Sequence, residues 1–268
     1  MKKFFSFVLT AISFLSANAQ VNIQLHYDLG RNINSASEPN RPKLTSTVEM
    51  FKPDRLGSTY FFVDMDYYSD GIAGAYWEIS REFTFAKPAE SNSFAAHIEY
   101  DGGLSNNKYA EKTSLYATSR FQQCFLLGPA WNWHNSDFSK TFSFQLMYKQ
   151  YLRQKSQYNG AGDYKAIASF QATAVWSTTF AHGWCTFAGF ADLWYGYTPR
   201  FDAAKGEQKK GLVFLTEPQF WLNIPATKGF SIGTEWEFSN DLVWVATPDG
   251  KKTKTFMWNP TIAAKYVF

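Results

Sequence analysis

The chain has 268 residues, a formal net charge of +3 and a mean hydropathy of −0.32, and 19% of its residues are aromatic. Charge this weak gives no basic bias, so nucleic acid is not a predicted partner. No apolar run after Gln20 is long enough for a membrane-spanning helix, which leaves two classes: a secreted soluble β protein or an outer-membrane β-barrel.

The first 19 residues are predicted to be a cleaved signal peptide. Lys2 and Lys3 form a positive start, residues 4–15 form an apolar run, and the small residues 17–19 form a cleavage site. The alternative, a transmembrane anchor, needs about 20 apolar residues. We therefore expect residues 1–19 to be a signal peptide and residues 20–268 to be one barrel domain.

Beyond Gln20, apolar and polar residues alternate with a period of two, as in "VNIQLHYDLG" at the start of the mature chain. This period is typical of β-strands with two different faces. The pattern predicts an all-β, antiparallel, up-and-down transmembrane barrel of about twelve strands. The expected strands lie near 21–30, 43–52, 57–68, 73–85, 93–102, 123–134, 141–152, 165–178, 184–196, 211–222, 229–245 and 256–268.

The predicted connections alternate between long and short. Outer-membrane barrels have long extracellular loops and short periplasmic turns, so both termini are expected in the periplasm of a Gram-negative-type envelope. "SDGI" (residues 69–72) breaks the alternation because it is brief where a long loop is expected. Residues 103–122 allow three interpretations: a surface loop with a short helix, a loop folded into the barrel mouth, or a pair of strand extensions.

One face of the predicted strands is rich in charge. Such a face suits the wet interior of a barrel, whereas unpaired carboxylates in a dry core are prohibitive. In a soluble sandwich the same residues form the solvent face. The predicted acidic lumen residues are Asp28, Glu49, Asp64, Asp66, Glu78, Glu82, Glu99, Asp101, Asp192, Glu217, Glu235 and Glu237, and the predicted basic ones are Lys149, Lys165 and Lys265.

Aromatic residues fall on both predicted faces. The lumen set has two interpretations: stacking surfaces for a planar base or sugar ring, or bulky filling of a narrow barrel. This set is Phe51, Tyr60, Phe62, Tyr68, Tyr76, Tyr151, Phe190, Trp194 and Trp221. The outward set fits interfacial girdles and includes Trp131, Trp133, Trp176, Phe256 and Trp258.

The sequence predicts neither a disulfide nor a metal, cofactor or catalytic site. Cys124 and Cys185 open strands of opposite direction, which places them far beyond the roughly 7 Å Cα separation that a disulfide spans. The histidines show no ligand spacing. Because no nucleophile motif is present either, the chain is not predicted to be an enzyme.

Several stretches resemble the nucleoside-specific channel-forming outer-membrane proteins, the Tsx-like family. They are "STVEMFK", "TYFFVDMDYYSDG", "AYWEISREFTF", "GFADLWYG" and the ending "KYVF". The resemblance implies a monomeric twelve-stranded barrel with a narrow lumen that passes nucleosides. It also implies that the terminal Phe268 is a signal for the barrel-assembly machinery. The substrate-binding residues expected on this basis are Glu49, Phe51, Tyr60, Phe62, Asp64, Tyr76, Glu78, Phe190, Asp192 and Trp194.

The leading hypothesis is a passive, selective outer-membrane channel for nucleosides or similar small polar solutes, in contact with outer-membrane lipid. Three alternatives stay open. The first is an outer-membrane lipid-modifying enzyme, which needs its nucleophile and base to face the bilayer. The second is a closed structural or adhesive barrel whose lumen residues are paired, and the third is a soluble secreted binding protein.

Overall fold

The computed structural model defines most of the chain after residue 18. It describes residues 19–34, 41–69, 71–108, 116–120, 122–154, 165–202, 207–242 and 256–268. The predicted signal peptide lies outside the described residues except for its last position, Ala19.

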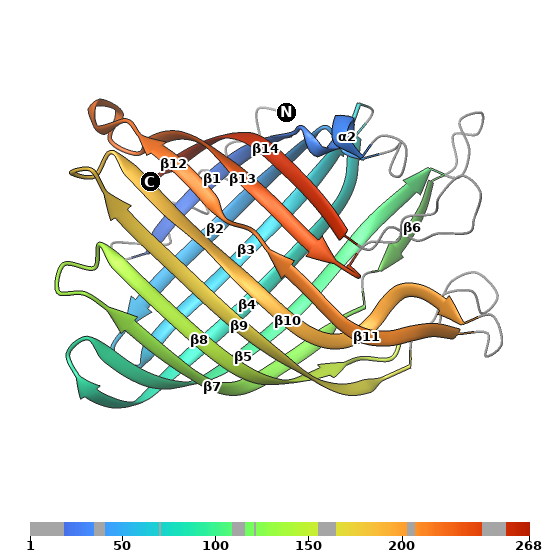
Figure 1. Ribbon diagram of the computed structural model, residues 1–268, viewed down its shortest axis with the longest axis horizontal. Helices are drawn as coiled ribbons and strands as arrows, with labels where there is room; N and C mark the ends of the chain where they lie inside the picture. Colours follow the sequence, from blue (N-terminus) through green and yellow to red (C-terminus); the bar gives the residue numbers. More distant parts are fainter. Residues whose placement is uncertain are drawn as a thin grey trace, which may run out of the picture.

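The described part of the chain is almost entirely antiparallel β-sheet, as the alternation predicts (Figure 1). The strands are β1 (Gln20–Asp28), β2 (Leu44–Asp54), β3 (Gly57–Tyr68), β4 (Gly71–Ala89), β5 (Asn92–Lys108), β6 (Tyr116–Arg120), β7 (Cys124–His134), β8 (Lys140–Tyr151), β9 (Ile167–Phe180), β10 (Cys185–Asp202), β11 (Glu207–Thr216), β12 (Gln219–Asn223), β13 (Phe230–Asn240) and β14 (Phe256–Val267). Two short helices are described, α2 (Gly30–Ile33) and the 3₁₀ helix η1 (Pro225–Thr227). No helix in these ranges combines the length and hydropathy needed to cross a membrane.

The sheet closes on itself because the last strand pairs with the first. Residues 261–267 of β14 pair with residues 22–28 of β1, and the Phe268 N–H donates to the Val21 carbonyl at 2.9 Å. β6 pairs with β5 alone, and β11 and β12 lie in line between β10 and β13. The barrel therefore has the twelve strands that the sequence predicts.

β11 and β12 form one barrel strand with a break at Glu217–Pro218. Pro218 has no N–H to donate to the ladder. On the neighbouring strand, Gly189 has a positive φ of 154°, and a Cβ there would lie 2.6 Å from the Glu217 carbonyl oxygen. β10 pairs with β11 and with β12 in the same register, so the break interrupts the strand without shifting its pairing.

Connection lengths alternate as predicted. Short turns join β2 to β3, β4 to β5, β7 to β8, β9 to β10 and β12 to β13, and they gather at the left of Figure 1 together with the C-terminus. We call this the short-turn end and the opposite one the long-loop end. The predicted exception holds, since β3 and β4 are separated by residues 69–70 alone.

Within residues 103–122, the structure supports the interpretation as strand extensions. β5 continues to Lys108, and its residues 104–108 pair with β6. This hairpin extends the wall at the long-loop end. The long connection between β10 and β11 is similar, because these two strands stay paired as far as Asp202 and Glu207.

The outward face is an apolar surface with aromatic contacts near both ends. Exposed leucine, isoleucine, valine and phenylalanine side chains occur on nearly every strand. Aromatic contacts near the long-loop end are Tyr100–Phe125, Phe170–Tyr195 and Phe238–Trp258, and those near the short-turn end are Trp131–Phe142, Phe180–Phe220 and Tyr266–Phe268. Two aromatic girdles around an apolar band are typical of a barrel embedded in lipid.

Candidate functional site: the barrel lumen

Strand register brings the predicted lumen residues onto the inner wall of one barrel. Glu49 of β2 lies opposite Phe62 of β3, Phe62 opposite Glu78 of β4, and Glu78 opposite Asp101 of β5. Since side chains alternate between faces, this one row fixes the inward positions of all four strands. The predicted division of the strands into two faces is therefore present on this wall.

Three aromatic rings form a row on this wall. The ring centroids of Tyr60 and Phe62 are 6.1 Å apart, and those of Phe62 and Tyr76 are 5.9 Å apart. The Tyr76 hydroxyl donates to Glu78 Oε1 at 2.7 Å, which joins the row to a carboxylate. Such a row offers a stacking face beside hydrogen-bond acceptors.

The remaining predicted residues of β2 and β3 lie beside this row. Asp64 accepts a 2.5 Å hydrogen bond from Thr47. Glu49 accepts from Asn22 at 3.2 Å and from Gln24 at 3.0 Å. Phe51 lies at the short-turn end, where 42% of it is exposed, so it is the predicted residue farthest from the enclosed part of the lumen.

The other predicted residues project from β10 on the opposite wall. Asp192 accepts a 2.5 Å hydrogen bond from Thr173, and the Trp194 ring lies 5.1 Å from Lys149 Nζ. Phe190 occupies the inward position next to the strand break, where its carbonyl accepts from Thr216 and from the Glu217 N–H.

Charged groups on the two walls interact across the lumen. Asp192 of β10 interacts electrostatically with Glu78 of β4, and Asp64 of β3 interacts in the same way with Glu217 and Glu235. Glu217 and Glu235 lie on the wall that contains the strand break. The predicted site residues thus form two groups that face one lumen.

The interior is partly filled and partly open to water. Trp221, Val213 and Met257 are fully buried inward side chains, and Lys265 Nζ lies 4.0 Å from the Trp221 ring centroid. By contrast, 23% of the Glu237 side chain and 20% of the Glu235 side chain remain exposed. The buried Trp221 thus fills part of the interior, as the second interpretation of the lumen aromatics expects.

Helix α2 packs against the inner wall at the long-loop end. The buried Asn34 side chain, just after α2, donates to the Asn259 side chain at 2.7 Å and to the Trp258 carbonyl at 3.0 Å. A Cβ on Gly30 would lie 2.8 Å from the Asn259 Cα, so only glycine permits this approach. Asp28 at the end of β1 forms a 2.6 Å ion pair with Arg41, which lies shortly before β2. This ion pair joins the two ends of the β1–β2 connection at the mouth of the lumen.

Sequence reasoning missed the side chains that surround Glu78. Glu99 and Asp101, predicted as lumen residues but not as site residues, lie beside it. His97 hydrogen-bonds both Glu82 and Glu99, at 3.2 and 3.1 Å. The signal was present in "HIEYD", which places all three β5 residues on one face, but their proximity to Glu78 depends on the pairing of β4 with β5.

Cys124 and Cys185 are both free, as predicted, and the Cys124 thiol donates to Asp101 Oδ2 at 3.0 Å. Lys165, predicted to line the lumen, is exposed and lies two residues before the start of β9 at Ile167. His26 and His97 both face the lumen, whereas a lipid-modifying enzyme needs its base on the bilayer side.

A family model described as "Domain of unknown function (DUF5020)" matches residues 19–268. No curated protein matches the sequence. Among solved structures, the NanC porin has a TM-score of 0.51 at 10% identity, over 92% of this chain and 99% of that one. The translocator domain of the autotransporter NalP from Neisseria meningitidis has a TM-score of 0.45 at 9% identity, over 100% and 96% of the two chains. OccAB3 of Acinetobacter baumannii has a TM-score of 0.40 at 8% identity, and the match covers 94% of this chain and 65% of OccAB3. The likeness to the NanC porin supports the barrel fold.

Proposed function

For this chain, which belongs to the DUF5020 family, we propose the function of a passive outer-membrane channel for small polar solutes. The observation that carries the proposal is the placement of side chains on the two faces of the barrel wall. Apolar and aromatic side chains point outward, and ionisable groups line an interior that water reaches. A soluble protein would place these faces the other way round. The porin-like fold is consistent with this function.

The outward face also supports the proposed location in a Gram-negative-type outer membrane, with lipid as its partner. The two aromatic girdles suit the two interfaces of a bilayer. Gln20 at the start of β1 and the C-terminal Phe268 both lie at the short-turn end. Outer-membrane barrels keep short turns on the periplasmic side, so we place both of these ends in the periplasm.

Within this function, nucleosides are the substrates that we propose. The row Tyr60–Phe62–Tyr76 supplies aromatic faces for a base, and Glu49, Asp64 and Glu78 supply acceptors for ribose hydroxyls or base N–H groups. Stacking on one aromatic side chain stabilises a base by about 1–3 kcal/mol. Phe190, Asp192 and Trp194 on the opposite wall complete the proposed contact surface.

The test compares two adjacent phenylalanines that point to opposite faces. The purified barrel in planar bilayers should show conductance that nucleosides block, and liposomes that contain it should take up labelled nucleosides. Phe62→Ala should weaken the block about 5- to 150-fold, the equivalent of one stacked base. Phe61→Ala, on the lipid side, should leave the block unchanged.

Two results would contradict these proposals separately. Conductance without any nucleoside effect would remove nucleosides as substrates but keep the channel. No conductance and no uptake, from protein that migrates as a folded barrel, would favour the closed structural barrel. That alternative has support in the buried Trp221, Val213 and Met257, which fill part of the interior.

A further inference from the structure

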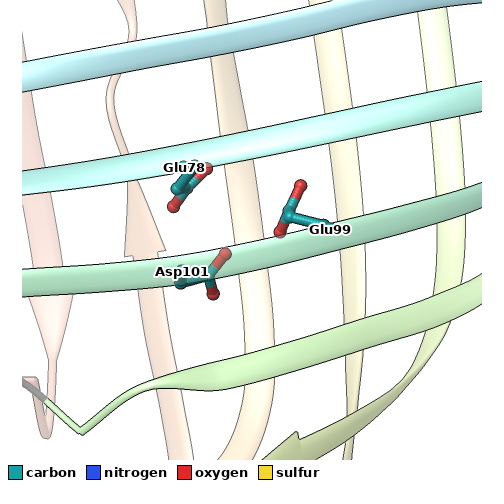
Figure 2. Close-up of side chains that lie close together, drawn as sticks. All are labelled: Glu78, Glu99 and Asp101. Atoms are coloured by element: carbon teal, nitrogen blue, oxygen red, sulfur yellow. The ribbon is translucent and has the colours of Figure 1, made fainter.

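Three carboxyl groups gather on the inner wall where β4 and β5 pair. Glu78 lies directly opposite Asp101, and Glu99 projects from β5 two residues before Asp101 on the same face. Each can offer an oxygen atom such that all three oxygens lie within 4.8 Å of one another. Figure 2 shows the three groups converging on one space beside the two strands.

Neighbouring groups satisfy only part of this cluster. Tyr76 donates to Glu78 Oε1, His97 hydrogen-bonds Glu99 Oε2, and Lys149 Nζ lies 3.6 Å from Asp101 Oδ2. With Glu78, Glu82, Glu99 and Asp101 ionised, and with Lys149 and His97 both protonated, two negative charges stay uncompensated. Charges of one sign this close repel strongly in an enclosed site, unless protons or a cation neutralise them.

A second observation points to a missing partner. Only 5% of the Asp101 side chain is exposed, and its Oδ1 is a buried atom without a hydrogen-bond partner among the described residues. The other oxygen, Oδ2, already accepts from the Cys124 thiol and faces Lys149. Buried polar atoms almost always have partners, so a carboxylate oxygen without one, beside two other carboxyl groups, calls for a proton or a cation at this position.

We propose that Glu78, Glu99 and Asp101 bind one Ca²⁺ ion, with water filling the remaining coordination positions. Ca²⁺ prefers carboxylate oxygens at about 2.3–2.6 Å and tolerates irregular geometry, so ligand atoms on opposite sides of the ion can be about 4.6–5.2 Å apart. The spacing in this cluster falls within that limit. The ion neutralises the two excess charges and bonds the orphaned Asp101 oxygen.

This site was not predicted from the sequence, because the spacing of histidines and cysteines was the only guide to metal binding. It also does not depend on the proposed channel function. Binding requires that the ion reach the lumen, whereas transport requires that a solute cross it. A bound ion would link β4 to β5 and would place a positive charge on an otherwise acidic wall.

The test uses the full-length mature protein, refolded in detergent and stripped with EDTA. Calorimetric titration with CaCl₂ should show one saturable site per barrel, and Ca²⁺ should raise the unfolding temperature. Asp101→Asn and Glu99→Gln should each weaken binding at least about tenfold, because each removes a charged ligand. The matched control is Glu237→Gln, a lumen carboxylate on β13 that faces Arg41 and Asn259 rather than the cluster.

Each variant is checked for the heat-dependent shift in gel mobility that marks a folded barrel. The inference is overturned if the folded wild-type protein binds no Ca²⁺, which would mean that protons alone neutralise the cluster. It is also overturned if both cluster variants bind Ca²⁺ as tightly as Glu237→Gln, or if Mg²⁺ binds in preference to Ca²⁺. Ca²⁺ binding without nucleoside flux would leave this inference intact and would count only against nucleosides as substrates.

Discussion

At the scale of single residues, Lys149 holds the inner wall together between β5 and β10. Its ammonium lies 3.6 Å from Asp101 Oδ2, donates to Gln171 at 2.7 Å, and sits 5.1 Å from the Trp194 ring centroid and 5.3 Å from that of Tyr151. Tyr151 belongs to a buried apolar cluster with Cys124, Leu126 and Met147. Lys149 is therefore the cation that permits Asp101 to be buried.

We expect Lys149→Met to destabilise the barrel by about 3–5 kcal/mol, because removing one partner leaves a buried charge unpaired. The measurement is urea unfolding in detergent with EDTA present, followed by tryptophan fluorescence. Lys140→Met is the control, since Lys140 is exposed at the start of the same strand. Equal unfolding midpoints for the two variants would show that Asp101 does not depend on Lys149.

Residue faces could be predicted from the sequence, but residue partners could not. Alternation alone places Glu78, Glu99 and Asp101 on the lumen side, because the strand period is two. Which of them meet depends on the register between β4 and β5, and no local pattern encodes it. The cluster and the Lys149 contacts were therefore not predicted, although all of their members except Gln171 were predicted to face the lumen.

At the scale of elements, α2 is a short helix attached to the mouth by few contacts. Asn34 supplies two of them through its side-chain amide, and Gly30 supplies the close approach to Asn259. A helix of four residues cannot be stable alone, so these tertiary contacts determine whether it stays on the inner wall. Its position bears on the width of the long-loop mouth.

Asn34→Ala should release α2 from β14 and increase the single-channel conductance. The lost hydrogen bonds leave the Trp258 carbonyl and Asn259 with fewer partners, which costs about 1–3 kcal/mol. Asn32→Ala is the matched control, because Asn32 is exposed on the same helix. Bilayer recordings of both variants decide the outcome, and an unchanged conductance in Asn34→Ala would show that α2 does not restrict the mouth.

The strands themselves were predicted closely, and the exceptions have physical causes. Alternation marks a strand wherever lipid and lumen lie on opposite sides, which holds along most of this chain. The break between β11 and β12 was missed because it arises from Pro218 together with the backbone of Gly189 on another strand. For residues 103–122 the sequence left strand extensions as one of three interpretations, because outside the membrane both faces of a strand can be polar and alternation no longer marks the strand.

At the scale of the whole molecule, the charge on the lumen differs from the charge on the chain. The formal net charge is +3, yet carboxylates on the inner wall far outnumber Lys149, Lys265 and the Arg41 at its mouth. The inward carboxylates are Asp28, Glu49, Asp64, Asp66, Glu78, Glu82, Glu99, Asp101, Asp192, Glu217, Glu235 and Glu237. A narrow passage lined by one sign of charge concentrates ions of the opposite sign.

The proposed channel should therefore conduct K⁺ in preference to Cl⁻, with a reversal potential of the cation-selective sign in a KCl gradient. The preference should decline as salt rises, because the Debye length falls from about 30 Å at 0.01 M to about 3 Å at 1 M.

The triple variant Glu217→Gln, Glu235→Gln, Glu237→Gln should reduce the selectivity. Asp137→Asn, in the turn between β7 and β8, should leave it unchanged, because that carboxylate lies outside the lumen and pairs with Ser139. A wild-type channel that prefers Cl⁻ would mean that the inward carboxylates are largely protonated, so that the lysines set the sign of the field along the permeation path.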